Sequence, residues 1–126
     1  MEAQEKYLDN LIFNLKIWNK DVKSHRSQLS KFEEKLQEVS ERNNGLEVKQ
    51  GVEQFQNRII VENEVIDTLS HKLKAKKKEL LNADKTQDID GSLKKSLSPI
   101  REEVKTFTKL NQELQHEISD FFMEWL

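Results

Sequence analysis

An alternating three- and four-residue spacing of apolar side chains from Leu8 to Val39 constrains this chain more than any other feature. Nine of its ten positions are apolar, and His25 is the exception. The positions are Leu8, Leu11, Leu15, Trp18, Val22, His25, Leu29, Phe32, Leu36 and Val39. This spacing places all ten residues on one stripe of a helix and is typical of a coiled coil or a long helical bundle.

Two further segments repeat the pattern. The second runs from Val52 to Ala83 and carries Glu62 and Lys76 at two of its apolar sites. The third runs from Leu93 to Trp125, and Asn111 is its exception. The whole sequence of 126 residues contains only three Gly and one Pro. A composition this poor in turn residues favours long helices over an all-β fold.

Three breaks interrupt the stripes. At residues 43–45 the sequence Asn-Asn-Gly predicts a tight hairpin, with Gly45 in the left-handed conformation and Leu46 folded back on the last turn. A polar, Asp-rich segment at residues 84–92 predicts a loop. Pro99 cannot donate a backbone hydrogen bond, so it predicts a break in the third helix.

These patterns predict an all-α fold, an antiparallel up-down-up three-helix bundle with long coiled-coil-like helices. We expect a single domain over residues 1–126. The expected helices cover residues 3–43, 47–83 and 93–126, with the break near Pro99 in the last. Gly51, near the start of the second helix, is expected to allow close approach of a neighbouring segment.

The polar exceptions fall at one level when the chain is folded about its two breaks. Folding about Gly45 places His25 opposite position 65, and folding about the loop places position 65 opposite Asn111. Glu62 is about one turn away. We therefore predict a core polar layer of His25 and Asn111, with Glu62 as a third member. Such a layer sets the register of the helices, because a slip would bury an unpaired polar group.

Composition narrows the class of protein further. The formal net charge is −2, so no strong overall field attracts nucleic acid or anionic lipid. The chain has no Cys, which excludes disulfides, Cys-ligated zinc and thiol catalysis. We expect no transmembrane segment, because no apolar run approaches the ~20 residues of a membrane span. We also expect no secretory signal, and hence a cytoplasmic location.

No motif indicates catalysis or a cofactor. The sequence lacks a Gly-rich phosphate loop, a nucleophile elbow and a paired-His metal motif. Glu113 and His116 form one Glu-x-x-His step, whereas di-iron bundles need two such steps and two further Glu, all facing inward. We therefore expect no enzyme, no catalytic residue, no metal and no cofactor.

Apolar residues outside the stripes point instead to protein partners. They form the set of partner-contact candidates, which are Phe13, Ile17, Ile60, Val61 and Phe122. We expect a non-catalytic helical interaction or scaffold module that binds another protein or a second copy of itself, a homodimer being one outcome. Whether these residues belong to the core or to an interface is left open by the sequence.

Two alternatives stand behind this interpretation. A basic patch near the end of the second helix could bind nucleic acid or an anionic surface, although interspersed acidic residues weaken its field. Its lysines are Lys72, Lys74, Lys76, Lys77 and Lys78. The second alternative, ranked below the basic patch, is a metal or acid-base site at His25.

Overall fold

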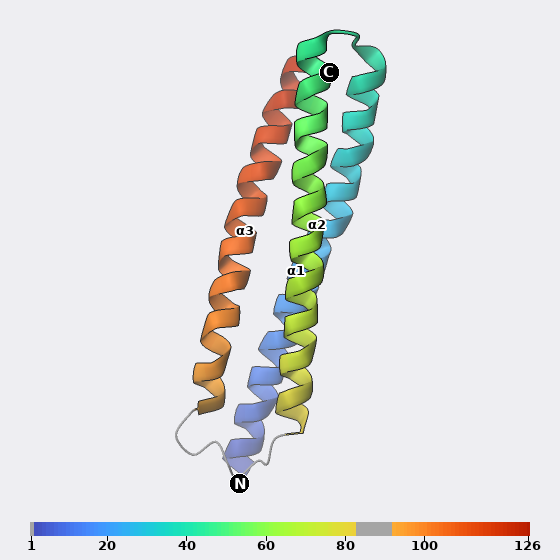
Figure 1. Ribbon diagram of the computed structural model, residues 1–126. Coiled ribbons are helices and arrows are strands. Elements are labelled where there is room, and N and C mark those ends of the chain that lie inside the picture. Colours follow the sequence, from blue (N-terminus) through green and yellow to red (C-terminus); the bar gives the residue numbers. More distant parts are fainter. Residues whose placement is uncertain (1, 83–91) are drawn as a thin grey trace.

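Three helices packed side by side form nearly all of the described chain, and the predicted all-α three-helix bundle is confirmed (Figure 1). The computed structural model describes residues 2–82 and 92–126. The helices are α1 Glu2–Arg42, α2 Leu46–Leu81 and α3 Ser92–Trp125. α1 and α3 run in the same direction and α2 runs in the opposite direction, and each helix contacts the other two. The predicted loop at 84–92 lies, except for its last residue, outside the described residues.

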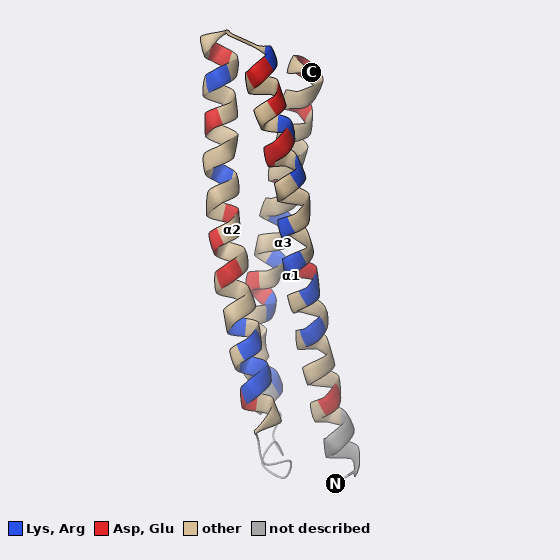
Figure 2. Cartoon of the chain, turned by 90° about the vertical axis from the view of Figure 1, so that its right-hand side faces the viewer, with Lys and Arg blue, Asp and Glu red and all other residues tan. Residues whose placement is uncertain are grey.

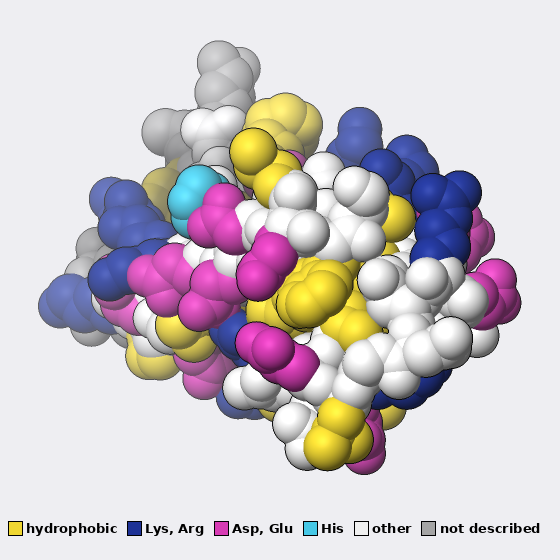
Figure 3. Space-filling model, turned by 90° about the horizontal axis from the view of Figure 1, so that it is seen from above, with side chains coloured by type: hydrophobic (Ala, Val, Ile, Leu, Met, Phe, Trp, Pro, Cys, Tyr) yellow, Lys and Arg dark blue, Asp and Glu magenta, His cyan; other side chains and the backbone are white. Residues whose placement is uncertain are grey.

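The apolar stripes of the sequence form the shared core of the three helices. The first-helix residues Leu15, Leu29 and Leu36 are at most 1% exposed, and the other helices contribute side chains that are at most 2% exposed, namely Ile59, Ile66, Leu114 and Ile118. Seen from the hairpin end, apolar side chains fill the middle while polar and charged groups surround them (Figure 3). Burial of these stripes supplies most of the stabilisation, at ~1.5–3 kcal/mol for each large side chain before entropy is subtracted.

The hairpin between α1 and α2 is closed differently from the prediction. Gly45 has φ −69° and ψ 143°, which is extended rather than left-handed, and it precedes the first residue of α2. Leu46 is exposed and does not fold back on α1. Side chains cap α1 instead, because Asn43 Nδ2 donates to the Val39 carbonyl at 2.9 Å and Lys49 Nζ donates to the Ser40 carbonyl at 2.8 Å. With these carbonyls satisfied, α1 can end without a left-handed residue.

Gly51 lies where an aromatic ring of α3 meets α2. A Cβ atom at this position would lie 2.7 Å from Cε2 of Phe121. The ring of Phe121 also packs against Phe55, with 5.2 Å between the centroids. The neighbouring segment expected at Gly51 is therefore α3, and any side chain there would displace the Phe121 ring.

The predicted break near Pro99 is wrong, because α3 continues through this residue. Proline leaves the carbonyl of residue 95, one turn earlier, without its usual backbone donor. Lys95 and Pro99 are both exposed, so this turn lies on the solvent side of α3 and water can bond the carbonyl. The flanking Leu97 and Val104 are buried and hold both sides of the proline to the same core.

Candidate interaction groove

The predicted polar-layer residues lie together at the centre of the bundle. Asn111 is fully buried, and its Nδ2 donates to Oε2 of Glu62 at 3.3 Å. His25 is half-buried on α1, and its ring packs edge-on against Phe107 with 5.4 Å between the centroids. The layer therefore draws one side chain from each helix, as the alignment about the two breaks predicts.

Gln115 connects the layer, and the sequence interpretation missed it. Its Nε2 donates to Oδ1 of Asn111 and lies 3.5 Å from Nδ1 of His25. Gln115 follows Asn111 by four residues, which places it one turn away on the same side of α3. That spacing was available in the sequence, but Gln115 lies beside the apolar stripe rather than within it. Glu62, Asn111, Gln115 and His25 thus form one chain of polar contacts across three helices.

The partner-contact candidates divide between surface and core. Phe13, Ile17, Ile60 and Val61 are exposed, at 61%, 40%, 53% and 55% of their surface. Phe122 is only 8% exposed and packs on Phe32, with 6.0 Å between the ring centroids. The assignment of Phe122 as a contact residue is therefore wrong. It follows Ile118 by four residues and joins the same stripe, because a three-helix interior is wider than a two-stranded seam.

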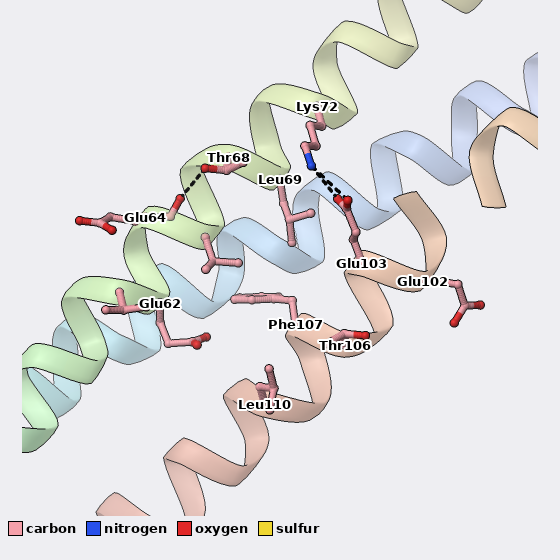
Figure 4. A pocket seen from close by; sticks show the side chains of 12 residues that line it. Glu62, Glu64, Thr68, Leu69, Lys72, Glu102, Glu103, Thr106, Phe107 and Leu110 are labelled. Carbon is pink, nitrogen blue, oxygen red and sulfur yellow. Dashed lines mark hydrogen bonds and ion pairs between the residues drawn. The ribbon is translucent and has the colours of Figure 1, made fainter. Parts of the chain in front are cut away.

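An apolar groove opens between α2 and α3 beside the polar layer (Figure 4). Its volume is about 590 Å³. Leu69 and Phe107, each 3% exposed, form its floor, and the exposed side chains of Val61 and Leu110 stand along it. A smaller hollow of about 320 Å³ continues it toward Asn57 and shares Val61, Glu62 and Leu110 with it.

The groove offers few hydrogen-bonding groups of its own. Its walls are helices, whose backbone N–H and C=O groups bond within the helix. The Thr68 hydroxyl also donates to the Glu64 carbonyl, at 3.0 Å. An extended peptide would therefore find no backbone partners here, whereas a helix brings its own backbone bonds.

Acidic side chains predominate around this groove. Glu62, Glu64, Glu102 and Glu103 line it together with a single cation, Lys72. Lys72 Nζ donates to Oε1 of Glu103 at 3.1 Å and bridges α2 and α3 at one end, as Figure 4 shows. Glu102 is paired with Lys105, at 3.8 Å, so two of the four carboxylates have an ion-pair partner. Among the described residues Glu62 and Glu64 have none, so the groove keeps a negative rim over its apolar floor.

The basic run of α2 does not form one surface. Figure 2 shows Lys and Arg gathered in the half of α2 that leads to its C-terminal end. Lys72 is paired with Glu103, and Lys76 is largely buried and 3.2 Å from Glu79. Lys74 and Lys77 face α1, where they line a second groove with lysines of that helix.

The Glu-x-x-His step lies on the outside of the bundle. Glu113 and His116 are both exposed, and His116 Nε2 is 3.8 Å from Oδ2 of Asp120. Over residues 2–82 and 92–126 no group of three or more His, Asp or Glu side chains is arranged to hold a metal ion. None of the helices in these ranges contains an apolar stretch that could span a lipid bilayer.

The fold and its groove define an all-α three-helix bundle with an apolar, acid-rimmed surface between its second and third helices. Comparison of the chain with protein-family models gave no match, and neither did comparison with curated proteins or with solved structures.

Proposed function

We propose that this protein is a non-catalytic interaction module whose α2–α3 groove binds an amphipathic helix with basic residues along its flanks. The observation that carries the proposal is the pairing of an apolar floor with a rim of four glutamates and one lysine. The adjoining hollow adds Glu113 and Arg58, and Arg58 is already paired with Glu117, so carboxylates still predominate along the whole length. An apolar helical stripe would cover Val61 and Leu110, and flanking Lys or Arg would approach the carboxylates. Such a helix would lie as a fourth member beside the bundle.

The size of the groove sets the length of the partner. From Asn57 to Lys72 the two connected hollows extend over four turns of α2, which is ~22 Å at 1.5 Å per residue. A partner helix of about 15 residues would fill that length. Its contact residues would recur at the three- and four-residue spacing that faces one side of a helix.

A synthetic peptide tests this proposal. The probe is a labelled helical peptide with a leucine stripe flanked by lysines, and the matched control peptide has glutamates in place of the lysines. We expect fluorescence anisotropy to give a dissociation constant of the order of 10 µM for the basic peptide and far weaker binding of the acidic one. Equal binding of both peptides, or of neither, would contradict the proposal.

Variants of the protein locate the binding surface. Val61→Ser with Leu110→Ser removes two exposed apolar contacts from the groove, so we expect at least a tenfold loss of affinity for the basic peptide. Met123→Ser is the matched control, because Met123 is 84% exposed on α3 and does not line the groove. An unchanged affinity in the double variant would exclude this groove as the site.

The competing hypothesis is self-association. The exposed contact candidate Phe13 on α1 would then lie at the interface between two copies of the chain. Light scattering on the wild type and on Phe13→Glu measures whether a concentration-dependent dimer forms through α1. A dimer abolished by Phe13→Glu would assign that face to a second copy. A dimer abolished instead by the Val61 and Leu110 changes would place a second copy in the groove and overturn the proposal of a basic partner helix.

A further inference from the structure

A second groove, between α1 and α2, is lined by five lysines. Lys16, Lys20 and Lys23 come from α1, and Lys74 and Lys77 come from α2. Leu15, Asn19 and Leu73 complete the lining of this space of about 380 Å³, and no acidic residue contributes to it. Only two of these lysines belong to the basic patch predicted from the sequence, because the other three lie far away along the chain.

The positive charge of this lysine groove is not neutralised by neighbouring acids. Within the described ranges, none of the five lysines takes part in an ion pair. The Lys74 ammonium lowers the pKa of Lys23 below the usual lysine value, because it can donate a hydrogen bond to the neutral Lys23 amine and repels its charged form, with a smaller contribution from desolvation. An anion bound between these two lysines would reduce the repulsion between their ammonium groups.

An exposed apolar pair lies beside this charge. Phe13 and Ile17 are 61% and 40% exposed, one turn apart on α1. Lys16 and Lys20 each follow one of them by three residues, so the four side chains are neighbours on the same side of the helix. A face that combines several lysines with exposed Phe and Ile is typical of helices that lie in a membrane interface.

We propose that this face of the bundle, made of the lysine groove with Phe13 and Ile17, binds an anionic lipid bilayer. The ammonium groups would contact phosphate and carboxylate groups of the lipid heads, while Phe13 and Ile17 would enter the boundary with the acyl chains. A nucleic acid would use the lysines equally well, but its phosphate backbone offers nothing apolar to cover both Phe13 and Ile17. α1 would then lie along the membrane surface.

Vesicle binding by the full chain tests the proposal. The probes are vesicles of phosphatidylcholine alone and vesicles that also contain phosphatidylserine, and co-sedimentation measures the bound fraction. We expect binding only to the phosphatidylserine vesicles, weakening as salt is added. No binding to them at low salt would overturn the proposal.

Two variants separate the charged from the apolar contribution. Lys20→Gln with Lys23→Gln should weaken binding at least tenfold, since each lysine near an anionic surface contributes about fivefold. Phe13→Ser should weaken it about tenfold. The controls remove the same groups elsewhere, with Lys105→Gln plus Lys109→Gln for charge and Met123→Ser for apolar surface, and both should leave binding unchanged.

A single-stranded oligonucleotide supplies the remaining comparison. Tighter binding of the oligonucleotide than of the vesicles, weakened by the Lys20 and Lys23 changes but not by Phe13→Ser, would assign the groove to nucleic acid and overturn the lipid proposal. Loss of vesicle binding in the control variants as strongly as in the test variants would show a non-specific charge effect, and would also overturn it.

Discussion

At the scale of single residues, the polar side chains on the apolar stripes have the largest structural consequence. Asn111 is fully buried and bonded to Glu62, and Gln115 links it toward His25. Each of these groups has its partner on another helix or one turn away. A shift of one helix by a heptad would leave the Asn111 amide against apolar side chains, without its partner on α2.

We expect Asn111→Ala to lower the free energy of unfolding by about 1–3 kcal/mol, because it leaves the Glu62 carboxylate and the Gln115 amide without their shared partner. Urea denaturation followed by circular dichroism measures this change. Gln112→Ala, at an exposed neighbouring position of the same helix, is the control and should have little effect. Equal stability losses in both variants would show that the layer contributes nothing specific.

A double variant tests whether the polar layer sets the register of the helices. In His25→Leu with Asn111→Leu the two stripes become fully apolar, so slipped alignments no longer bury these two polar groups. We expect extra or broadened backbone amide signals in NMR spectra, even if the melting temperature is maintained. A single sharp set of signals would mean that apolar packing alone fixes the alignment.

At the scale of elements, α3 shows how tertiary packing overrides a local signal. Pro99 weakens the helix at its own position, yet buried leucine and valine side chains on both sides keep one continuous axis. Helix propensity predicts a break because Pro99 lacks a backbone N–H donor. It takes no account of the core packing on both sides of the proline. The C-terminal end of α1 shows the same contrast, since side-chain caps from Asn43 and Lys49 replace the expected left-handed glycine.

Pro99→Ala should therefore stabilise the protein, by up to about 3 kcal/mol, because it restores one backbone donor inside a helix. Thermal unfolding followed by circular dichroism gives the change in melting temperature. Ser98→Ala, at the exposed preceding position, is the control for a general gain in helix propensity. A destabilised Pro99→Ala variant would mean that proline ends one helix and begins another, as the sequence alone suggested.

At the scale of the whole molecule, the apolar stripe of a helix does not determine which of its other apolar side chains are buried. Phe122 and Phe13 are both phenylalanines outside the predicted stripes, yet one is 8% and the other 61% exposed. The aromatic contact between Phe122 and Phe32 joins α3 to α1. The exposed residues on α1 and along α2 and α3 leave two chemically distinct faces, one with five lysines and one with an acidic rim.

Alanine substitutions at these two residues should separate core from surface. We expect Phe122→Ala to lower the free energy of unfolding by about 3–5 kcal/mol, because it removes a buried ring from the interior. Phe13→Ala should change it by no more than about 0.5 kcal/mol. Chemical denaturation of both variants measures the difference, and similar losses in the two would contradict the assignment of Phe13 to the surface.

The sequence by itself determined the helical class, the three apolar stripes and the common level of His25, Glu62 and Asn111. These features follow from the period of the helix and from the lengths of the segments between breaks, which are properties of the chain. Only the tertiary structure decided the burial of Phe122, the link through Gln115, the α2–α3 groove and the meeting of lysines from α1 and α2. Those depend on how each helix is rotated about its axis and how closely it packs on its neighbours, and periodicity along one chain carries no information about either.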